Sequence, residues 1–309
     1  MKIVIFCEAG VNIGMGHLSR CNILKQRILH FLQTNKIRAE VEICCYQEKI
    51  SQEAWFKNIA PYLEGVDRVI IDSYLADYSV YELATRLVKK VLVIDDIARL
   101  KYPKECLILN GGIDTKSLYY EMGIKSENIF AGIEYALIHP CFLKNRPPKK
   151  RSQKILICFG GSDREDHTWR AYQKIKNLKY KPVIILGPYY QGRATQIQNC
   201  EIYKGLSQEE LALIFNEVEI AISSGGVILN ELLASGVFVF CIPIAKNQEY
   251  QAEKYHQLKY IKKTNLENIL NDLDSFKPIF SKKTLNFGIG FDKILGGFIL
   301  NKDENGESF

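Results

Sequence analysis

The stretch Gly14-Met15-Gly16-His17-Leu18-Ser19-Arg20 follows the apolar residues 3–6 and leads into a segment whose apolar residues have helical spacing. This order predicts a strand, a glycine turn and a helix that begins near His17. A helix N-terminus presents unpaired N–H groups, and glycines let a ligand approach the backbone, so the turn is suited to an anionic group. The stretch therefore predicts a binding site after the first strand.

His17 is the candidate catalytic residue of this stretch. The positive end of a helix favours a neutral imidazole, which can accept a proton from water or from a hydroxyl group. The alternative is that Gly14 and Gly16 only form the turn and that His17 caps or packs the helix, because short glycine motifs often occur by chance.

Length and composition restrict the class of protein. At 309 residues the chain is long for one core, which predicts two domains. An apolar fraction of 47% with 25% charged residues is typical of a globular protein. No apolar run approaches the ~20 residues that cross a bilayer, and the N-terminus lacks a secretory signal. We therefore expect no membrane span and a cytoplasmic location.

The cysteines and the net charge restrict the kinds of ligand and partner that the sequence predicts. The nine cysteines lie mostly in apolar runs without a C-x-x-C pair, which favours reduced core thiols over a metal site or disulfides. The net charge of +6 is modest and lies partly in residues 144–151. An anionic small molecule fits this charge as well as a nucleic acid does, so no nucleic-acid partner is predicted.

The first half of the chain alternates strand-like and helix-like segments, as expected for parallel strands joined by crossover helices. Its strands are apolar throughout, which indicates burial on both faces of an open, doubly wound α/β sheet. Ligands of such sheets bind at the carboxyl ends of the strands. Residues 10–17, Asp72-Ser73-Tyr74 and Asp95-Asp96 are all predicted to lie there.

Residues 143–153 (LKNRPPKKRSQ) contain two prolines and five basic residues and are the best candidate for a domain linker. The strand that follows them begins the same order of strand, glycine turn and helix as the first half. The sequence therefore predicts two tandem Rossmann-like domains, residues 1–145 and residues 152–309.

Two glycine turns follow strands in the second half, at Gly160-Gly161-Ser162 and at Ser224-Gly225-Gly226. The helix N-terminus at Gly226 is predicted to bind a phosphate or pyrophosphate through backbone N–H groups. Glu231 lies about one and a half turns into that helix, where a carboxylate can accept hydrogen bonds from paired ribose hydroxyls. The alternative for Glu231 is a solvated side chain on the helix surface.

Asn247 and Gln248 open a later helical segment and could contact a sugar or phosphate, or simply begin the helix. Several common sites are absent from the sequence. A G-x-G-x-x-G fingerprint would need glycine at Ser19, no G-x-x-x-x-G-K-[ST] occurs, and the five histidines show neither H-E-x-x-H nor H-x-x-x-H spacing. We therefore predict neither NAD nor a catalytic metal, and we expect no cofactor.

The order and spacing of these motifs resemble the family of UDP-sugar hydrolases of pseudaminic acid biosynthesis, over nearly the whole chain. The motifs that carry the resemblance are Ile13-Gly14-Met15-Gly16-His17-Leu18-Ser19-Arg20, Ile71-Asp72-Ser73-Tyr74, Ile94-Asp95-Asp96, Gly132 with Tyr135-Ala136-Leu137-Ile138, Gly160-Gly161-Ser162-Asp163, Ser224-Gly225-Gly226 with Asn230-Glu231-Leu232, Pro243 and Asn247-Gln248. The two-domain plan also resembles nucleotide-sugar glycosyltransferases with paired Rossmann-like domains, the GT-B fold.

The resemblance implies a site in a cleft between the domains. His17 would activate water to displace UDP from the anomeric carbon with inversion and without a metal. The residues implied on the sugar side are Glu8, Gly14, Gly16, Asp72 and Tyr74. Those implied on the nucleotide side are Gly160, Gly161, Ser162, Ser224, Gly225, Gly226, Glu231, Asn247 and Gln248.

Two departures bear on the substrate, because the family usually has arginines where Phe6 and His139 stand. The predicted function is hydrolysis of a UDP-linked 2,4-diacetamido-2,4,6-trideoxy sugar, which feeds nonulosonic acid synthesis. One alternative is a glycosyltransferase in which His17 deprotonates an acceptor hydroxyl. A second is a non-catalytic protein that binds a UDP-sugar. The sequence does not determine the oligomeric state.

Overall fold

The computed structural model describes residues 1–10, 12–48, 50–51, 53–123, 127–143, 153–198, 200–276 and 285–300. These residues form two compact units. The first contains residues 1–137 together with 286–300, and the second contains residues 138–285. The proposed linker lies almost entirely outside the described residues, since only its first and last positions are described.

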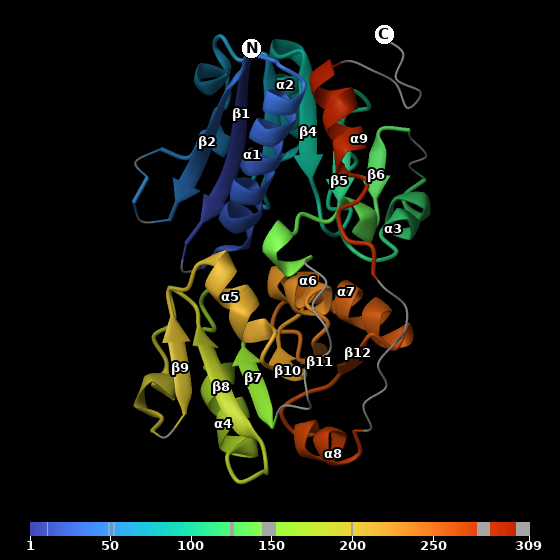
Figure 1. The fold of residues 1–309 in the computed structure, drawn as a ribbon. Coiled ribbons are helices and arrows are strands. Elements are labelled where there is room, and N and C mark those ends of the chain that lie inside the picture. Colours follow the sequence, from blue (N-terminus) through green and yellow to red (C-terminus); the bar gives the residue numbers. More distant parts are fainter. Residues whose placement is uncertain are drawn as a thin grey trace. The chain divides into compact units, whose positions relative to one another are not determined.

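The first unit is built on a parallel six-stranded sheet with strand order β2-β1-β3-β4-β5-β6 (Figure 1). Its strands are β1 Lys2–Ala9, β2 Glu40–Gln47, β3 Arg68–Asp72, β4 Lys90–Ile94, β5 Leu107–Asn110 and β6 Ile129–Ala131; its helices are α1 Gly16–Thr34, α2 Tyr78–Leu87, α3 Lys116–Glu121, α9 Phe291–Leu295, the short 3₁₀ turns η1 Trp55–Lys57, η2 Ala60–Leu63 and η3 Ile133–Tyr135, and the π-helical turn η6 Gly296–Leu300. The chain order reverses direction between β1 and β3, which makes this pair the topological switch point.

The side-chain alternation of β1 explains why both faces of this sheet are covered. Ile3 and Ile5 pack with buried residues of α1, whereas Val4 and Phe6 pack in a separate cluster with residues of α2. Seven of the eight residues of β1 are buried. A strand that is buried along nearly its whole length between two helical layers is what a doubly wound parallel sheet requires.

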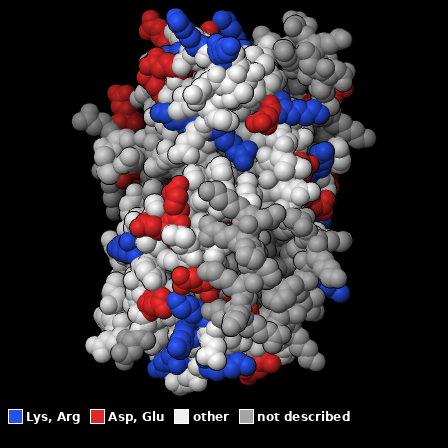
Figure 2. All heavy atoms as spheres, viewed as in Figure 1, with Lys and Arg blue, Asp and Glu red and all other residues white. Residues whose placement is uncertain are grey.

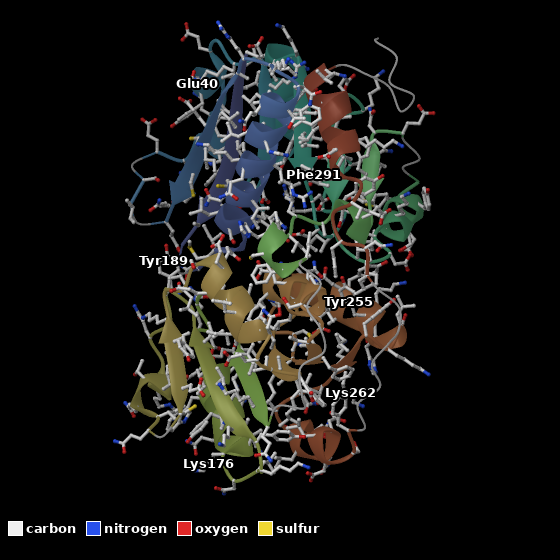
Figure 3. All side chains as sticks on the ribbon, viewed as in Figure 1. Glu40, Lys176, Tyr189, Tyr255, Lys262 and Phe291 are labelled. Atoms are coloured by element: carbon white, nitrogen blue, oxygen red, sulfur yellow. The ribbon has the colours of Figure 1, made fainter. Side chains whose placement is uncertain are left out.

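The segment 286–300 belongs to the first unit, whereas the sequence placed residues 152–309 together. Phe291 of α9, labelled in Figure 3, is fully buried in the cluster that includes Leu107 of β5. The buried Arg68 guanidinium donates to the carbonyl oxygens of Phe298 and Ile299 at 2.6 and 2.8 Å. The physical reason is that α1 covers mainly β1 and β2 on this face of the sheet. The C-terminal helix buries the apolar residues of β4 and β5 on the same face.

The second unit has a parallel sheet with strand order β12-β11-β10-β7-β8-β9. Its strands are β7 Lys154–Cys158, β8 Lys181–Leu186, β9 Glu201–Lys204, β10 Ile220–Ser223, β11 Phe238–Cys241 and β12 Ile261–Lys263; its helices are α4 His167–Ile175, α5 Gln208–Phe215, α6 Val227–Ala234, α7 Lys246–Gln257, α8 Ile269–Asp274 and the 3₁₀ turns η4 Pro140–Phe142 and η5 Arg193–Gln196. Renumbered within the unit, this is the 3-2-1-4-5-6 order of the Rossmann fold, with its switch point between β7 and β10.

The predicted class, two doubly wound α/β domains in tandem, is confirmed. Within the described residues, no helix combines the length and apolar character needed to span a membrane. On the face shown in Figure 2, Lys and Arg side chains are interspersed with Asp and Glu.

Candidate active site

The turn after β1 is closed by its own backbone. Gly10 and Gly14 exchange two hydrogen bonds, N–H to O at 3.1 and 2.7 Å. Gly14 has φ +88°, a left-handed conformation that favours glycine, and an added Cβ there would meet no atom. Backbone conformation, not crowding, therefore explains this glycine. The turn returns the chain to begin α1 at Gly16, which places His17 in its first turn.

His17 contacts a buried carboxylate from the next strand. Its Nδ1 atom lies 2.6 Å from Oδ1 of Asp72, the last residue of β3. Both side chains are buried, with exposed fractions of 6% and 0%. The sequence separates these residues by 55 positions, and the pairing of β1 with β3 at the switch point brings them together.

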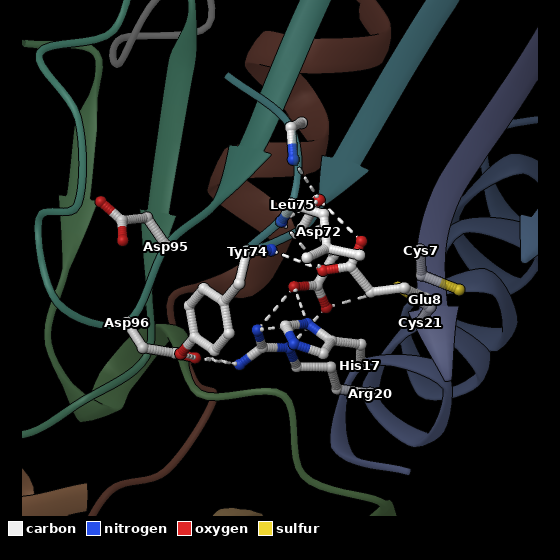
Figure 4. Close-up of polar contacts among 12 residues, drawn as sticks. Cys7, Glu8, His17, Arg20, Cys21, Asp72, Tyr74, Leu75, Asp95 and Asp96 are labelled. Carbon is white, nitrogen blue, oxygen red and sulfur yellow. Dashed lines mark hydrogen bonds and ion pairs between the residues drawn. The ribbon is translucent and has the colours of Figure 1, made fainter. Parts of the chain in front are cut away.

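Arg20 binds the same carboxylate from one turn further along α1. Its Nε and Nη2 atoms each donate to Asp72 at 2.5 Å, one to each carboxylate oxygen (Figure 4). Burial alone would raise the pKa of Asp72, but the guanidinium of Arg20 and the ring of His17 outweigh it and hold that pKa well below its usual range. Asp72 is therefore ionised at neutral pH.

The ionised state of Asp72 determines which ring nitrogen of His17 carries the hydrogen. The carboxylate can only accept, so Nδ1 carries the hydrogen and donates, and Nε2 keeps its lone pair. Arg20 Nη2 lies 3.2 Å from Nδ1, but both atoms are donors that converge on the same Oδ1. The arrangement leaves the lone pair of His17 Nε2 available to accept a proton.

A second carboxylate completes the cluster. Arg20 Nη1 donates to both oxygens of Asp96, at 2.7 and 2.8 Å. The Tyr74 hydroxyl donates to Asp96 Oδ2 at 2.6 Å, and its ring meets the His17 ring edge to face at a centroid distance of 4.8 Å. Figure 4 shows Tyr74, from the loop after β3, lying next to His17 and Arg20 of α1.

Glu8 is fully buried and organises the loop after β3. Its carboxylate accepts from Ser73 Oγ at 2.8 Å, from the Tyr74 N–H at 2.6 Å and from the Leu75 N–H at 3.3 Å. We predicted sugar contacts for Glu8 and Asp72. Both carboxylates accept hydrogen bonds from donors of the protein, through which Glu8 positions Tyr74 and Asp72 positions His17, and the sugar contacts stay predictions.

The first glycine turn of the second unit is occupied by the chain itself. Asp163 accepts from the N–H groups of His167 and Thr168, at 2.8 Å each, and so caps the start of α4. A Cβ on Gly187 would lie 2.2 Å from the carbonyl oxygen of Gly160 and 2.3 Å from that of Gly161. This turn is therefore tightly packed, and the positive end of its helix already holds a carboxylate.

The second glycine turn differs, because no side chain in the described part of the protein caps α6 at Gly226. Gln248 Oε1 accepts from the N–H groups of Gly225 and Ile244, at 3.1 and 3.0 Å. Its amide oxygen thus joins two loops of the protein, and the ligand contact of Gln248 stays a prediction. Asn247 lies in the first turn of α7. Tyr255 of the same helix, labelled in Figure 3, donates to Asn230 Oδ1 at 2.8 Å and fixes α7 to α6.

Glu231 of α6 is 4% exposed, which contradicts the alternative of a solvated side chain. Among the described residues, no side-chain hydrogen bond or ion pair of its carboxylate is present. Burial raises its pKa to about 8. A buried acid group without a partner, just beyond an uncapped helix N-terminus, is suited to accept hydrogen bonds from a ligand.

This burial predicts a stability cost that depends on pH. The pKa of Glu231 is higher in the folded protein than in the unfolded chain, so its neutral form favours folding and that contribution disappears as pH rises from about 4.5 to about 8. Glu231→Gln, which stays neutral, should therefore stabilise the ligand-free protein by about 1–3 kcal/mol at pH 8.5 and by less at pH 5. Thermal melts at both pH values measure this; Glu267→Gln, an exposed site in the same unit, is the control. Equal melting temperatures at pH 8.5 would contradict it.

No group of three or more His, Cys, Asp or Glu side chains in the described part of the chain is arranged to hold a metal ion. The sequence predicted His17, Asp72 and Tyr74 as site residues and placed Asp96 at the same strand ends, but it did not predict that Arg20 joins these carboxylates. The spacing of His17 and Arg20 on one face of a helix was the available signal.

Two Rossmann-like units of this topology define the GT-B fold. The solved UDP-GlcNAc 2-epimerase of Neisseria meningitidis, bound to UDP-GlcNAc, has a TM-score of 0.64 and 15% identity, with 98% of this chain and 100% of that chain covered. The MurG structure of Acinetobacter baumannii has a TM-score of 0.55 and 17% identity, with 89% and 90% covered.

Among characterised sequences, the chain is similar to a Helicobacter pylori protein named pseudaminic acid cytidylyltransferase and UDP-2,4-diacetamido-2,4,6-trideoxy-beta-L-altropyranose hydrolase. The identity is 28% over 282 residues, which cover 90% of this chain and 51% of that protein. An uncharacterised Methanocaldococcus jannaschii protein, MJ1062, is 25% identical, with 86% of this chain and 60% of that protein covered. The chain thus spans about half to three fifths of these relatives. No protein-family model matches it.

Proposed function

We propose that this chain is an enzyme of UDP-sugar metabolism that hydrolyses a UDP-linked 2,4-diacetamido-2,4,6-trideoxy sugar and releases UDP and the free sugar, the precursor for a nonulosonic acid. The observation that carries the proposal is the 2.6 Å contact between His17 Nδ1 and the buried Asp72, which leaves Nε2 as a base. The hydrolase activity in the name of the Helicobacter pylori relative supports the choice of sugar.

In the proposed reaction, His17 Nε2 takes a proton from water as the water oxygen bonds to the anomeric carbon. The bond from that carbon to the UDP oxygen breaks, and UDP leaves with the electron pair. Attack opposite to the leaving group inverts the configuration. Asp72 accepts the Nδ1 hydrogen throughout and stabilises the imidazolium that forms.

We assign nucleotide binding to the second unit. The uncapped N-terminus of α6 offers N–H groups to a diphosphate, and fixed donors of this kind stabilise the charge that grows on a leaving group. The partnerless carboxylate of Glu231 would accept the ribose hydroxyls. The turn at Gly160 and Ser162 is a weaker candidate, because Asp163 already occupies the N-terminus of α4.

Glu231→Ala should weaken the binding of UDP and of the UDP-sugar together, because a ribose contact is made equally in the ground and transition states. Because burial raises the pKa of Glu231 to about 8, its acid group is largely neutral at pH 7. A hydrogen bond to a neutral acceptor contributes ~0.5–1.5 kcal/mol, or about a two- to tenfold change in affinity. Isothermal calorimetry with UDP measures this, with Glu267→Ala as the control. Unchanged UDP affinity would remove Glu231 from the binding site.

Phe6 and His139, which stand where the hydrolase family usually has arginines, lie in different surroundings in the structure. Phe6 is fully buried and packs on Trp55 with ring centroids 5.1 Å apart, so its side chain belongs to the core. His139 caps η4 by accepting from the Cys141 N–H at 3.4 Å. Phe6 therefore has no exposed group that could contact a ligand. His139 stabilises the start of η4 through its ring nitrogen.

The test is incubation with UDP-2,4-diacetamido-2,4,6-trideoxy-β-L-altropyranose and no acceptor, followed by NMR of the released sugar. UDP release with inverted anomeric configuration supports the hydrolase, and UDP-GlcNAc serves as the comparison substrate. If UDP is released only after an acceptor is added, the protein is instead a glycosyltransferase, in which His17 deprotonates the acceptor hydroxyl. Binding without release would indicate a non-catalytic UDP-sugar binding protein.

A further inference from the structure

Arg20 is surrounded by more negative charge than it can balance. Its side chain is 10% exposed and binds two carboxylates, the fully buried Asp72 and the Asp96 side chain, which is 33% exposed. Burial would lower the pKa of Arg20, but the carboxylates of Asp72 and Asp96 outweigh it and raise that pKa, so the guanidinium stays charged. While His17 is neutral, the cluster carries one surplus negative charge.

The surplus negative charge stabilises the ring of His17 once that ring has taken a proton. Arg20 offsets much of the charge of Asp72, so this carboxylate stabilises an imidazolium less than an unpaired carboxylate would. Asp96 adds a second negative charge, so a proton on His17 brings the net charge of His17, Arg20, Asp72 and Asp96 to zero. Charges fixed in a buried, low-dielectric site act strongly on a group that becomes charged during a reaction.

We propose that Arg20 and Asp96 are positioning residues for His17. Arg20 holds Asp72 in place through two hydrogen bonds, and Asp96 supplies the charge that stabilises the protonated imidazole. The effect on rate rests on the proposed function, whereas the effect on the protonation of His17 does not.

The groups around His17 fit this role. Asp72 faces it from β3, Arg20 from its own helix, and Tyr74 from the loop after β3. The Tyr74 hydroxyl holds Asp96 against Arg20, while the Glu8 carboxylate fixes the Tyr74 backbone. Cys21 reaches Asp72 through its thiol at 3.6 Å. Among these residues, Asp96 combines a charge with partial exposure, so it can be neutralised with little disturbance of the core.

The test is Asp96→Asn, followed by NMR titration of the histidine rings. Five histidines are present, and the His17 signals are identified by their loss in His17→Asn. The midpoint of the His17 titration should fall by about 0.5–1 pH unit in Asp96→Asn, and it should stay near the wild-type value in Asp96→Glu. Glu82→Gln, which removes a charge from an exposed pair with Arg86 in the same unit, is the control and should change nothing.

Kinetics provide the second readout. If the protein releases UDP, Asp96→Asn should lower kcat about three- to tenfold and shift the rising limb of the pH profile to lower pH, with KM changed less than about twofold. An unmoved His17 titration in Asp96→Asn overturns the inference, whatever the activity. If the wild-type protein releases no UDP while the titration shifts as expected, the proposed function fails and the positioning role of Asp96 stands.

Discussion

Replacing His17 with asparagine should lower the rate of UDP release by ~10²–10⁴-fold, the usual contribution of a general base. Asparagine can donate to Asp72 but has no atom that accepts a proton from water at neutral pH. The loss should appear in kcat, because the base acts on the water and only in the transition state. Steady-state kinetics with the altropyranose substrate measure it.

UDP affinity separates this effect from misfolding. We assign the nucleotide to residues of the second unit, so calorimetry should give the same UDP affinity for His17→Asn and for wild type. His30→Asn is the matched control, because His30 is exposed on the same helix. Wild-type turnover in His17→Asn would show that another group activates water and would remove the basis of the proposed mechanism.

The sequence predicted the two sheets because their strands are apolar runs that alternate with helical segments. It could not predict where the C-terminal segment packs. Phe291 and Phe298 indicate a buried helix, but no local pattern states which sheet that helix covers. The answer depends on the space that α1 leaves over β4 and β5, which is a property of the folded first unit.

The candidate site shows the same limit at the level of single residues. The glycine turn and helix start identified His17, and the carboxyl ends of strands identified Asp72 as a neighbour. A strand-end carboxylate can face a ligand or a buried arginine, and sequence alone does not distinguish them. Asp72 and Glu8 both bind groups of the protein. Glu231 shows the converse, since its place on α6 was predicted and its burial was not.

Asp72→Asn should also lower turnover by about 10²–10⁴-fold, although Asp72 is fully buried and is proposed to act only through His17. The amide lacks the negative charge that stabilises the imidazolium. Arg20 donates to both carboxylate oxygens, so either orientation of the amide turns its NH₂ group toward a donor of that guanidinium. The variant thus loses both the charge and the fixed orientation of His17.

A double-mutant cycle decides whether Asp72 acts through His17. In the His17→Asn background, adding Asp72→Asn should change the remaining rate less than about threefold, because residues that act as a unit are strongly non-additive. Asp95→Asn controls for the loss of a buried aspartate, since Asp95 binds the N–H groups of Ile97 and Arg99 and the Tyr119 hydroxyl. UDP calorimetry and thermal melts confirm that each variant is folded. If the two losses multiply in the double variant, Asp72 contributes to the reaction independently of His17, and the pair is not the base.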